Sequence, residues 1–239
     1  MELTQNPYDH VAKSYDEISR KREKYLDSVD QIVIDLLSDY EYLKMFDFGS
    51  GNGKRAKKIS DKLASDGLVL SDSSELMVKE CLKIDNAKVF QVMGTDVPLF
   101  EKEFQGIIAL WNVLGHIKDS KDRIKVLSLL RKNLAEGGRL IFDVNNRYNG
   151  ASYGYCKCFF RFLIDSIHFN PKRGDVEYTW SVRGQEIKSS GHVFTPKEIA
   201  FEMNNAGLRV DKKFYVNYET GRVSRWFFMG QMLFSCEEK

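Results

Sequence analysis

Apolar and polar stretches alternate in a regular order along the first 146 residues. Short apolar runs predict strands over 41–49, 67–72, 88–92, 104–113 and 138–146. Apolar residues recur at helical spacing between those runs, over 54–64, 74–83 and 120–138. Because apolar strands alternate with helices, we expect a parallel sheet that is covered on both faces and binds ligands at the carboxyl ends of its strands.

The pattern changes after residue 146. Segment 151–169 is dense in aromatic residues, and segment 175–194 reads as antiparallel strands with polar turns. A helix is predicted over 195–208, because Thr195 suits an N-cap and Pro196 the first helical position. Two strands then end the chain. We therefore expect one domain over 1–239: a doubly wound, mostly parallel seven-stranded α/β sheet, with helices on both faces and an insertion at 147–192 after the fifth strand.

Composition changes this picture little. The chain has 239 residues and a net charge of +2, which is too weak to indicate a nucleic-acid partner. Its four cysteines do not form a disulfide framework, and no His or Cys pair accompanies Cys156 and Cys158 to make a metal site. The first ten residues lack an apolar signal segment, and no run of 18 apolar residues occurs. We expect a cytoplasmic protein with no metal and no membrane partner.

A bare turn, FDFGSGNGKR at 46–55, follows the first strand and opens a helix. Glycine permits positive φ and lets a ligand approach the backbone, and the free N–H groups of a helix N-terminus attract anions. A dinucleotide fingerprint would need a third glycine at position 54, which is Lys54. A phosphate-binding loop would need a G-K-S/T sequence that is also missing. The spacing is G-x-G-x-G, preceded by Asp47.

These residues resemble the first motif of the Rossmann-like (class I) S-adenosylmethionine-dependent methyltransferases. The sequence DSSELM, 72–77, is similar to the family's D-x-S-x-x-M, and VPLFEKEFQGIIALWNVLGHIKD, 97–119, resembles its passage from the fourth strand to a His-Ile pair. The resemblance covers roughly 40–146 and 192–235. In that family an acidic residue ends the second strand and accepts both ribose hydroxyls, a role that falls here on Asp72. Asp47 would orient the glycine loop and meet the ligand's ammonium group.

The resemblance implies S-adenosylmethionine as the cofactor and a helical N-terminal cover over 1–35, with Tyr8 and Tyr15 closing over it and Arg22 pairing with the methionyl carboxylate. The adenine contact is open, because Met93 stands where the family often has an aspartate, and Gln105 also departs from the family pattern. The implied cofactor contacts are Asp47, Gly49, Ser50, Gly51, Gly53, Asp72, Ser73, Met93, Gly94, Thr95, Trp111, Asn112, Tyr15 and Arg22.

His116 follows the fourth strand and is the candidate catalytic residue. It is either a general base with a pKa near neutral or a structural residue of the pocket wall. Methyl transfer needs no base, because the sulfonium is already activated and alignment supplies much of the rate. His192 and Tyr148 are weaker candidates. Aromatic residues of the insertion either line an acceptor pocket or pack a helix: Tyr155, Phe159, Phe160 and Phe162.

We expect a methyltransferase that acts on a nitrogen or oxygen nucleophile of a small molecule. A second hypothesis is a transferase acting on RNA, such as a modified tRNA base, through cations in 20–24 and 54–58. A third is a non-catalytic module that binds the cofactor, and Lys54 disfavours a nicotinamide dehydrogenase. An enclosed aromatic pocket would favour the first hypothesis, and an open basic pocket the second.

Overall fold

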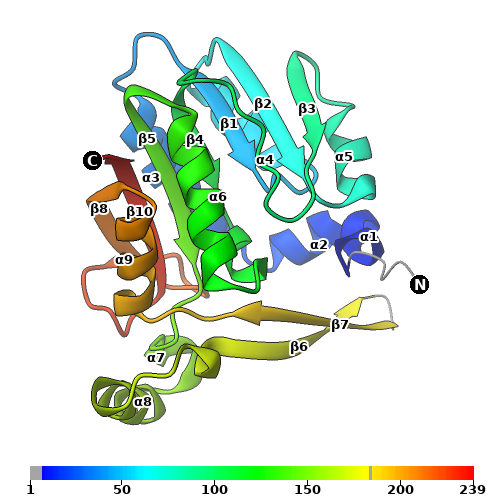
Figure 1. Cartoon of the computed structure of the whole chain (residues 1–239). Coiled ribbons are helices and arrows are strands. Elements are labelled where there is room, and N and C mark those ends of the chain that lie inside the picture. The colour runs from blue at the N-terminus through cyan, green and yellow to red at the C-terminus, as the bar shows by residue number, and fades with distance from the viewer. Residues whose placement is uncertain (1–6, 183–184) are drawn as a thin grey trace.

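The fold is built around one eight-stranded sheet (Figure 1). The structure is a computed structural model that describes residues 7–182 and 185–239. In spatial order the strands are β3 (Ala87–Gln91), β2 (Gly67–Asp72), β1 (Lys44–Phe48), β4 (Phe104–Ala109), β5 (Leu134–Val144), β10 (Gln231–Glu238), β8 (Leu208–Val216) and β9 (Val223–Ser224). Strands β1 to β5 are mutually parallel, whereas β10 runs antiparallel to both of its neighbours. The mostly parallel α/β sheet is as predicted.

Helices cover both faces of this sheet, because neighbouring residues of each strand point to opposite sides. Phe46 belongs to one buried cluster together with residues of α6 and α9. Its neighbour Met45 belongs to a second cluster with residues of α3, α4 and α5. The helices are α3 (Glu23–Leu37), α4 (Lys54–Lys62), α5 (Glu75–Cys81), α6 (Ser120–Lys132) and α9 (Pro196–Asn205). The strands are apolar on both sides for this reason, and the doubly wound arrangement is confirmed.

The sheet has eight strands, and the predicted number of seven was wrong. The additional strand is β9, a two-residue pairing with Tyr215 and Val216 that has no periodic signal of its own. The last predicted strand also begins later, at Gln231, because Phe227 and Phe228 leave the sheet to pack against Tyr148. Helix α6 ends at Lys132 rather than at the predicted glycines, and those glycines lie inside β5.

Two further segments lie outside the sheet and the helices that cover it (Figure 1). The first is N-terminal: α1 (Pro7–Val11), a 3-10 turn η1 (Ala12–Ser14) and α2 (Tyr15–Arg20). The second joins β5 to α9 and consists of α7 (Gly150–Tyr153), α8 (Tyr155–Ile167), η3 (Pro171–Gly174) and a hairpin of β6 (Asp175–Val182) and β7 (Gln185–His192). Figure 1 shows this hairpin running under α1 and the sheet. Thr195 caps α9 with a full capping box, as its sequence predicted.

Candidate active site

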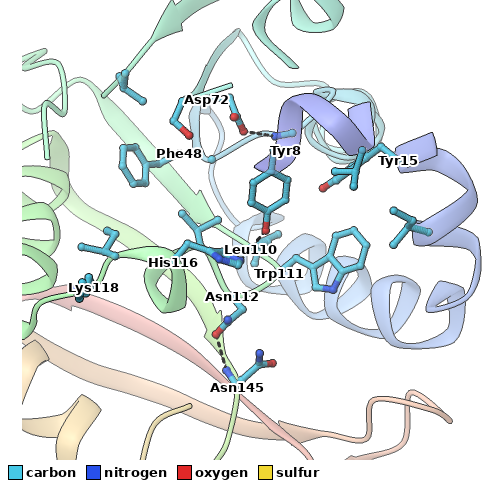
Figure 2. Close-up of a pocket in the computed structure, with 18 of the residues that line it drawn as sticks. Tyr8, Tyr15, Phe48, Asp72, Leu110, Trp111, Asn112, His116, Lys118 and Asn145 are labelled. Carbon is cyan, nitrogen blue, oxygen red and sulfur yellow. Dashed lines mark hydrogen bonds between the residues drawn. The ribbon is translucent and has the colours of Figure 1, made fainter. Parts of the chain in front are cut away.

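A cavity of about 680 Å³ opens at the carboxyl ends of the parallel strands (Figure 2). Its floor is the glycine loop after β1 and the end of β2, and its walls are the loop after β4 and the N-terminal helices. Tyr178 of the hairpin and Tyr218 after β8 complete the lining. The volume lies in the usual range for small-molecule sites, and four tyrosines and a tryptophan give the cavity a largely aromatic wall.

The glycine loop approaches its surroundings more closely than any larger residue would permit. Gly51 has φ +56°, and a Cβ atom there would lie 2.7 Å from the Tyr15 hydroxyl. Gly49 has φ +79°, and its Cβ would lie 2.6 Å from Val113. The backbone N–H groups of Gly49 and Ser50 both donate to the Ser71 carbonyl at 2.8 Å, which ties the loop to β2. Glycine is therefore required at both positions, by the positive φ and by the close packing of Val113 and Tyr15 against the loop.

Asp72 ends β2 and faces the cavity. Its carboxylate accepts the N–H of Gly51 at 2.8 Å and the N–H of Ser74 at 2.9 Å. Burial raises the pKa of Asp72, and these backbone hydrogen bonds oppose the rise. Ser74, rather than Asp72, is the N-cap of α5 and accepts from the Met77 N–H at 3.2 Å. A backbone hydrogen bond with Ser73 also opposes the rise in the pKa of Asp72, and a carboxylate, with about four acceptor sites, keeps capacity for a ligand hydroxyl.

Asp47 lies under the loop rather than in the cavity lining. It is buried at the end of β1, where burial raises its pKa to about 7. The positive charge of Arg55 and a contact with Ser50 act in the opposite direction. Arg55 is itself paired with Asp30 at 2.5 Å. An ammonium group bound above the loop would favour the charged form of this carboxyl group.

Trp111 and Asn112 lie in the left-handed region, with φ +72° and +63°, although neither is glycine. Two hydrogen bonds to side chains hold them there. The Trp111 backbone N–H donates to the Asp143 carboxylate, and the Asn145 backbone N–H donates to Asn112 Oδ1 at 2.8 Å. The Trp111 indole N–H donates to the Tyr218 hydroxyl at 2.9 Å. Backbone strain supported in this way is typical of functional loops.

His116 lies between two tyrosines. Its Nε2 is 2.6 Å from the Tyr8 hydroxyl, and its Nδ1 is 3.5 Å from the Tyr178 hydroxyl. Burial lowers the pKa of His116 to about 4, and a backbone hydrogen bond with Ser190 acts in the opposite direction. The imidazole is therefore neutral near pH 7. A base titrating near 6.5, as the sequence suggested, does not fit this environment, because the loss of solvent outweighs the opposing hydrogen bond with Ser190.

The N-terminal segment supplies the opposite wall from residue 7 onward, and residues 1–6 of the cover expected over 1–35 lie outside the described residues. Tyr15 packs edge-on against Trp111, with ring centroids 5.5 Å apart. Arg22 lines the cavity, lies 4.4 Å over the Tyr218 ring and pairs with Glu219 at the rim. Burial raises the pKa of both Tyr8 and Tyr15, so each hydroxyl stays protonated.

Most of the predicted site residues come together in this cavity. The predicted residues among its described lining are Tyr15, Arg22, Gly49, Gly51, Asp72, Ser73, Gly94, Thr95, Trp111, Asn112 and His116. Asp47, Ser50 and Gly53 support the loop from outside that lining, and Met93 is exposed beside it. Sequence reasoning missed Asn145, Tyr178 and Tyr218 in the wall and Asp143 behind it. Only Asp143 gave a signal, as a carboxylate within the apolar strand IFDV.

Two weaker candidates and the insertion aromatics lie elsewhere. His192 belongs to a charged network described next, and the Tyr148 hydroxyl donates to Asp165 at 3.1 Å. Three aromatic residues of α8 expected in an acceptor wall are exposed and lie outside the described lining of the cavity: Tyr155, Phe159 and Phe160. Phe162 packs against Tyr148 instead. The contribution of the insertion to the cavity is therefore made by Tyr178 of the hairpin.

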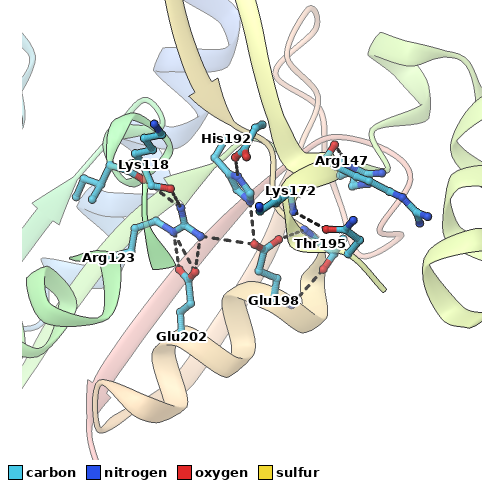
Figure 3. Close-up of polar contacts among 12 residues, drawn as sticks. Lys118, Arg123, Arg147, Lys172, His192, Thr195, Glu198 and Glu202 are labelled. Carbon is cyan, nitrogen blue, oxygen red and sulfur yellow. Dashed lines mark hydrogen bonds and ion pairs between the residues drawn. The ribbon is translucent and has the colours of Figure 1, made fainter. Parts of the chain in front are cut away.

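A buried charged network anchors the base of this hairpin (Figure 3). His192 ends β7 and lies 2.8 Å from both Asp175 and Glu198. Arg123 of α6 pairs with Glu202 at 2.6 Å and lies 3.6 Å from Glu198. Its remaining N–H groups donate to the carbonyls of Ile117 and Lys118 at 3.0 Å, directly after His116. One network therefore holds both the hairpin and the loop that carries His116.

Comparison with known proteins gives structural but no sequence matches. No protein-family model matches the sequence, and no curated protein is similar to it in sequence. An S-adenosylmethionine-dependent methyltransferase from Clostridium acetobutylicum superposes with a TM-score of 0.66 at 14% identity, over 98% of this chain and 99% of that one. A possible histamine N-methyltransferase from Thermotoga maritima gives 0.67 at 16%, over 98% of each chain.

A putative methyltransferase from Haloferax volcanii, solved with the activator Trm112, gives a TM-score of 0.68 at 13% identity, over 97% of this chain and 95% of that one. All three likenesses extend over nearly the whole of both chains. The chain therefore has the fold of the class I S-adenosylmethionine-dependent methyltransferases.

Proposed function

We propose that the protein is an S-adenosylmethionine-dependent methyltransferase that acts on a nitrogen or oxygen nucleophile of a small molecule. The observation that carries the proposal is the cradle formed by Gly51 and Asp72. A Cβ at Gly51 would clash with Tyr15, so the bare loop backbone lies directly against the N-terminal segment, and the Asp72 carboxylate beside it faces the cavity. A carboxylate placed beside an exposed loop backbone suits a ribose hydroxyl of a nucleoside.

The chain's own groups divide the cavity into a cofactor side and an acceptor side. Asp72 would hold the ribose, Asp47 would meet the ammonium group through the loop, and Arg22 would pair with the carboxylate. S-adenosylmethionine, when bound, supplies a methyl group already activated on a sulfonium sulfur. Tyr8, His116 and Tyr178 lie together on another wall and would border the acceptor.

These groups act by positioning and by excluding water. Neutral hydroxyl and imidazole groups can orient an uncharged amine or hydroxyl without adding charge near a cationic donor. Trp111 and Tyr15 close the cavity with apolar surface, which removes solvent from the nucleophile. Holding the nucleophile in line with the methyl group supplies a large part of the rate. Any base chemistry at His116 would begin from a neutral imidazole that already contacts Tyr8.

The pairing of cations on α4 supports a small acceptor over RNA. Lys54, Arg55, Lys57 and Lys58 each pair with a carboxylate: Asp16, Asp30, Asp61 and Asp27 respectively. Cations neutralised in this way release few counterions from a phosphate backbone. The five Tyr and Trp side chains in the cavity lining support the same choice, because small-molecule sites are rich in aromatic residues.

Two measurements test the proposal. Calorimetry should give roughly micromolar affinity for S-adenosylmethionine and for S-adenosylhomocysteine, as is usual for substrate sites, and no binding of NAD. Release of S-adenosylhomocysteine should then be followed with a panel of small amines and alcohols beside bulk tRNA. Turnover with tRNA but with none of the small molecules would show that the enzyme acts on RNA. Cofactor binding without turnover across a broad panel would favour a non-catalytic module, and NAD binding alone would refute the proposal.

A further inference from the structure

Helix α8 presents its apolar face to solvent. Six large apolar side chains recur at helical spacing and are all exposed; this α8 face consists of Tyr155, Phe159, Phe160, Leu163, Ile164 and Ile167. Phe160 is 63% exposed and Ile167 is 89% exposed. Helices on the surface of a globular protein normally turn such a stripe toward the core. An outward stripe of this size indicates an interaction surface.

Polar contacts on the opposite side of α8 fix this orientation. Asp165 points inward, is buried, and pairs with Arg147 at 2.8 Å and with Arg173 at 3.1 Å. Cys158 on the same side is fully buried against Tyr148 and Phe228. Turning the apolar stripe inward would expose these contacts and break a buried ion pair, which is costly. The outward stripe is therefore part of the native packing.

Aromatic and basic residues surround the α8 face. Trp226 is exposed and stacks on Tyr155, with ring centroids 5.9 Å apart. Lys157 of α8 is exposed, and Arg161 lies at the border of the stripe over the Tyr153 ring. Asp165 is the single acidic residue within 150–174, and it is buried and paired. The surface thus combines apolar, aromatic and cationic groups without an exposed carboxylate.

We propose that α8 binds in the plane of an anionic lipid bilayer. Helices with a basic border, large apolar residues and interfacial aromatics bind membranes in this way, with the apolar face buried at the headgroup boundary. The helix has 13 residues, or about 20 Å, which is too short to cross a bilayer. In the described ranges 7–182 and 185–239, no helix is long and apolar enough to do so. The expectation of no membrane partner rested on spanning segments and did not address an in-plane helix.

The charge pattern favours a bilayer over a second copy of the chain. A two-fold contact through the α8 face would place cations of both copies around one apolar patch with no exposed carboxylate from 150–174 to meet them. An anionic surface complements those cations directly. Figure 1 shows α8 projecting from the end of the molecule distant from β3, so a flat surface can reach it.

Sedimentation with lipid vesicles tests the proposal. The full chain should bind vesicles of phosphatidylcholine with about a third phosphatidylglycerol, bind pure phosphatidylcholine vesicles at least tenfold less, and bind less as salt rises. The double variant Phe160→Asp with Ile164→Asp should lose at least tenfold in binding. Phe201→Asp is the matched control, because Phe201 is 61% exposed on α9, and it should bind like the native chain.

The substituted side chains are exposed, so both variants should keep the native circular dichroism and melting temperature. Failure of the native chain to sediment with anionic vesicles would overturn the proposal, as would equal binding by the α8 double variant. Light scattering distinguishes a second copy of the chain from a bilayer. If the native chain is a dimer that does not bind lipid, and the double variant is a monomer, the α8 face is a dimer interface.

Discussion

The Tyr8 hydroxyl lies 2.6 Å from Nε2 of His116, so the first helix and the loop after β4 meet across the cavity. Burial raises the pKa of Tyr8 and lowers that of His116 to about 4, so both groups are neutral near pH 7. Either group can be the donor in this hydrogen bond, depending on the imidazole tautomer. In both tautomers the Tyr8 hydroxyl already engages Nε2, the ring nitrogen nearest to it.

This relationship makes His116 a positioning residue in our expectation. His116→Asn should retain turnover within about tenfold, whereas loss of a true general base costs roughly 10²–10⁴-fold. With cofactor at saturation, the pH profile of kcat should show no inflection from His116 between about pH 5.5 and 8, because the imidazole is neutral throughout. Steady-state kinetics of the native protein, His116→Asn and Tyr8→Phe check this. A loss of turnover above a hundredfold in His116→Asn, with turnover kept in Tyr8→Phe, would show that His116 acts as a general base.

The same pKa predicts how stability depends on pH. Between about pH 4 and 6.5 the unfolded chain binds more protons at His116 than the folded chain does, so the free energy of unfolding falls as pH decreases through this window. The loss is at most ~3 kcal/mol. Urea unfolding at pH 7 and pH 4.5 should show a smaller difference for His116→Asn than for the native chain. An equal difference in both proteins would contradict the lowered pKa.

Asp72 should determine cofactor affinity. Asp72→Asn keeps the shape of the side chain but removes the charge that strengthens hydrogen bonds to hydroxyls, so affinity for S-adenosylmethionine should fall tenfold or more. Thr195→Ala is the control: it removes the cap of α9, away from the described cavity lining, and should lower stability by about 1 kcal/mol without changing affinity. Calorimetry and urea unfolding separate the two effects. If Asp72→Asn binds S-adenosylmethionine with unchanged affinity, the Asp72 carboxylate has only a structural role.

Asp47 should release a proton when the cofactor binds. Its pKa of about 7 in the free protein leaves it partly protonated at pH 6.5, and a bound ammonium group would lower that pKa. Calorimetry at pH 6.5 in buffers of different ionisation enthalpy should detect net proton release that declines toward pH 8.5. Asp47→Asn should abolish this component. A buffer-independent binding enthalpy in the native protein would show that the ligand's positive charge does not reach Asp47.

The Arg123 network should dominate local stability. Arg123→Ala leaves buried Glu202 without its cation, whereas Glu198 keeps His192, and the change should cost about 3–5 kcal/mol. Arg209→Ala removes an ion pair with Glu237 whose arginine is exposed, and should cost less than about 1 kcal/mol. Chemical unfolding of both variants makes the comparison. Similar small losses would mean that water or rearrangement compensates the buried carboxylates.

The sequence by itself determined the order of elements and the position of the glycine loop. Strand periodicity, the Thr195 cap and the alternating glycines at 49–53 are local signals, and local backbone preferences decide them. The position of Asp72 at the end of β2 followed equally from a short apolar run with an acidic residue after it. The doubly wound sheet could also be predicted from the sequence, because strands with apolar residues on both sides require helices on both faces of the sheet.

Only the tertiary structure decided which distant side chains share an environment. Tyr8 and His116 are 108 residues apart in sequence, and Tyr178 lies 62 residues beyond His116, so no local pattern brings them together. The outward face of α8 has an ordinary amphipathic sequence, and its direction depends on Asp165 finding two arginines inside. The pKa values of Asp47 and His116 likewise follow from burial, and burial arises only when separate parts of the chain pack and remove water from these groups.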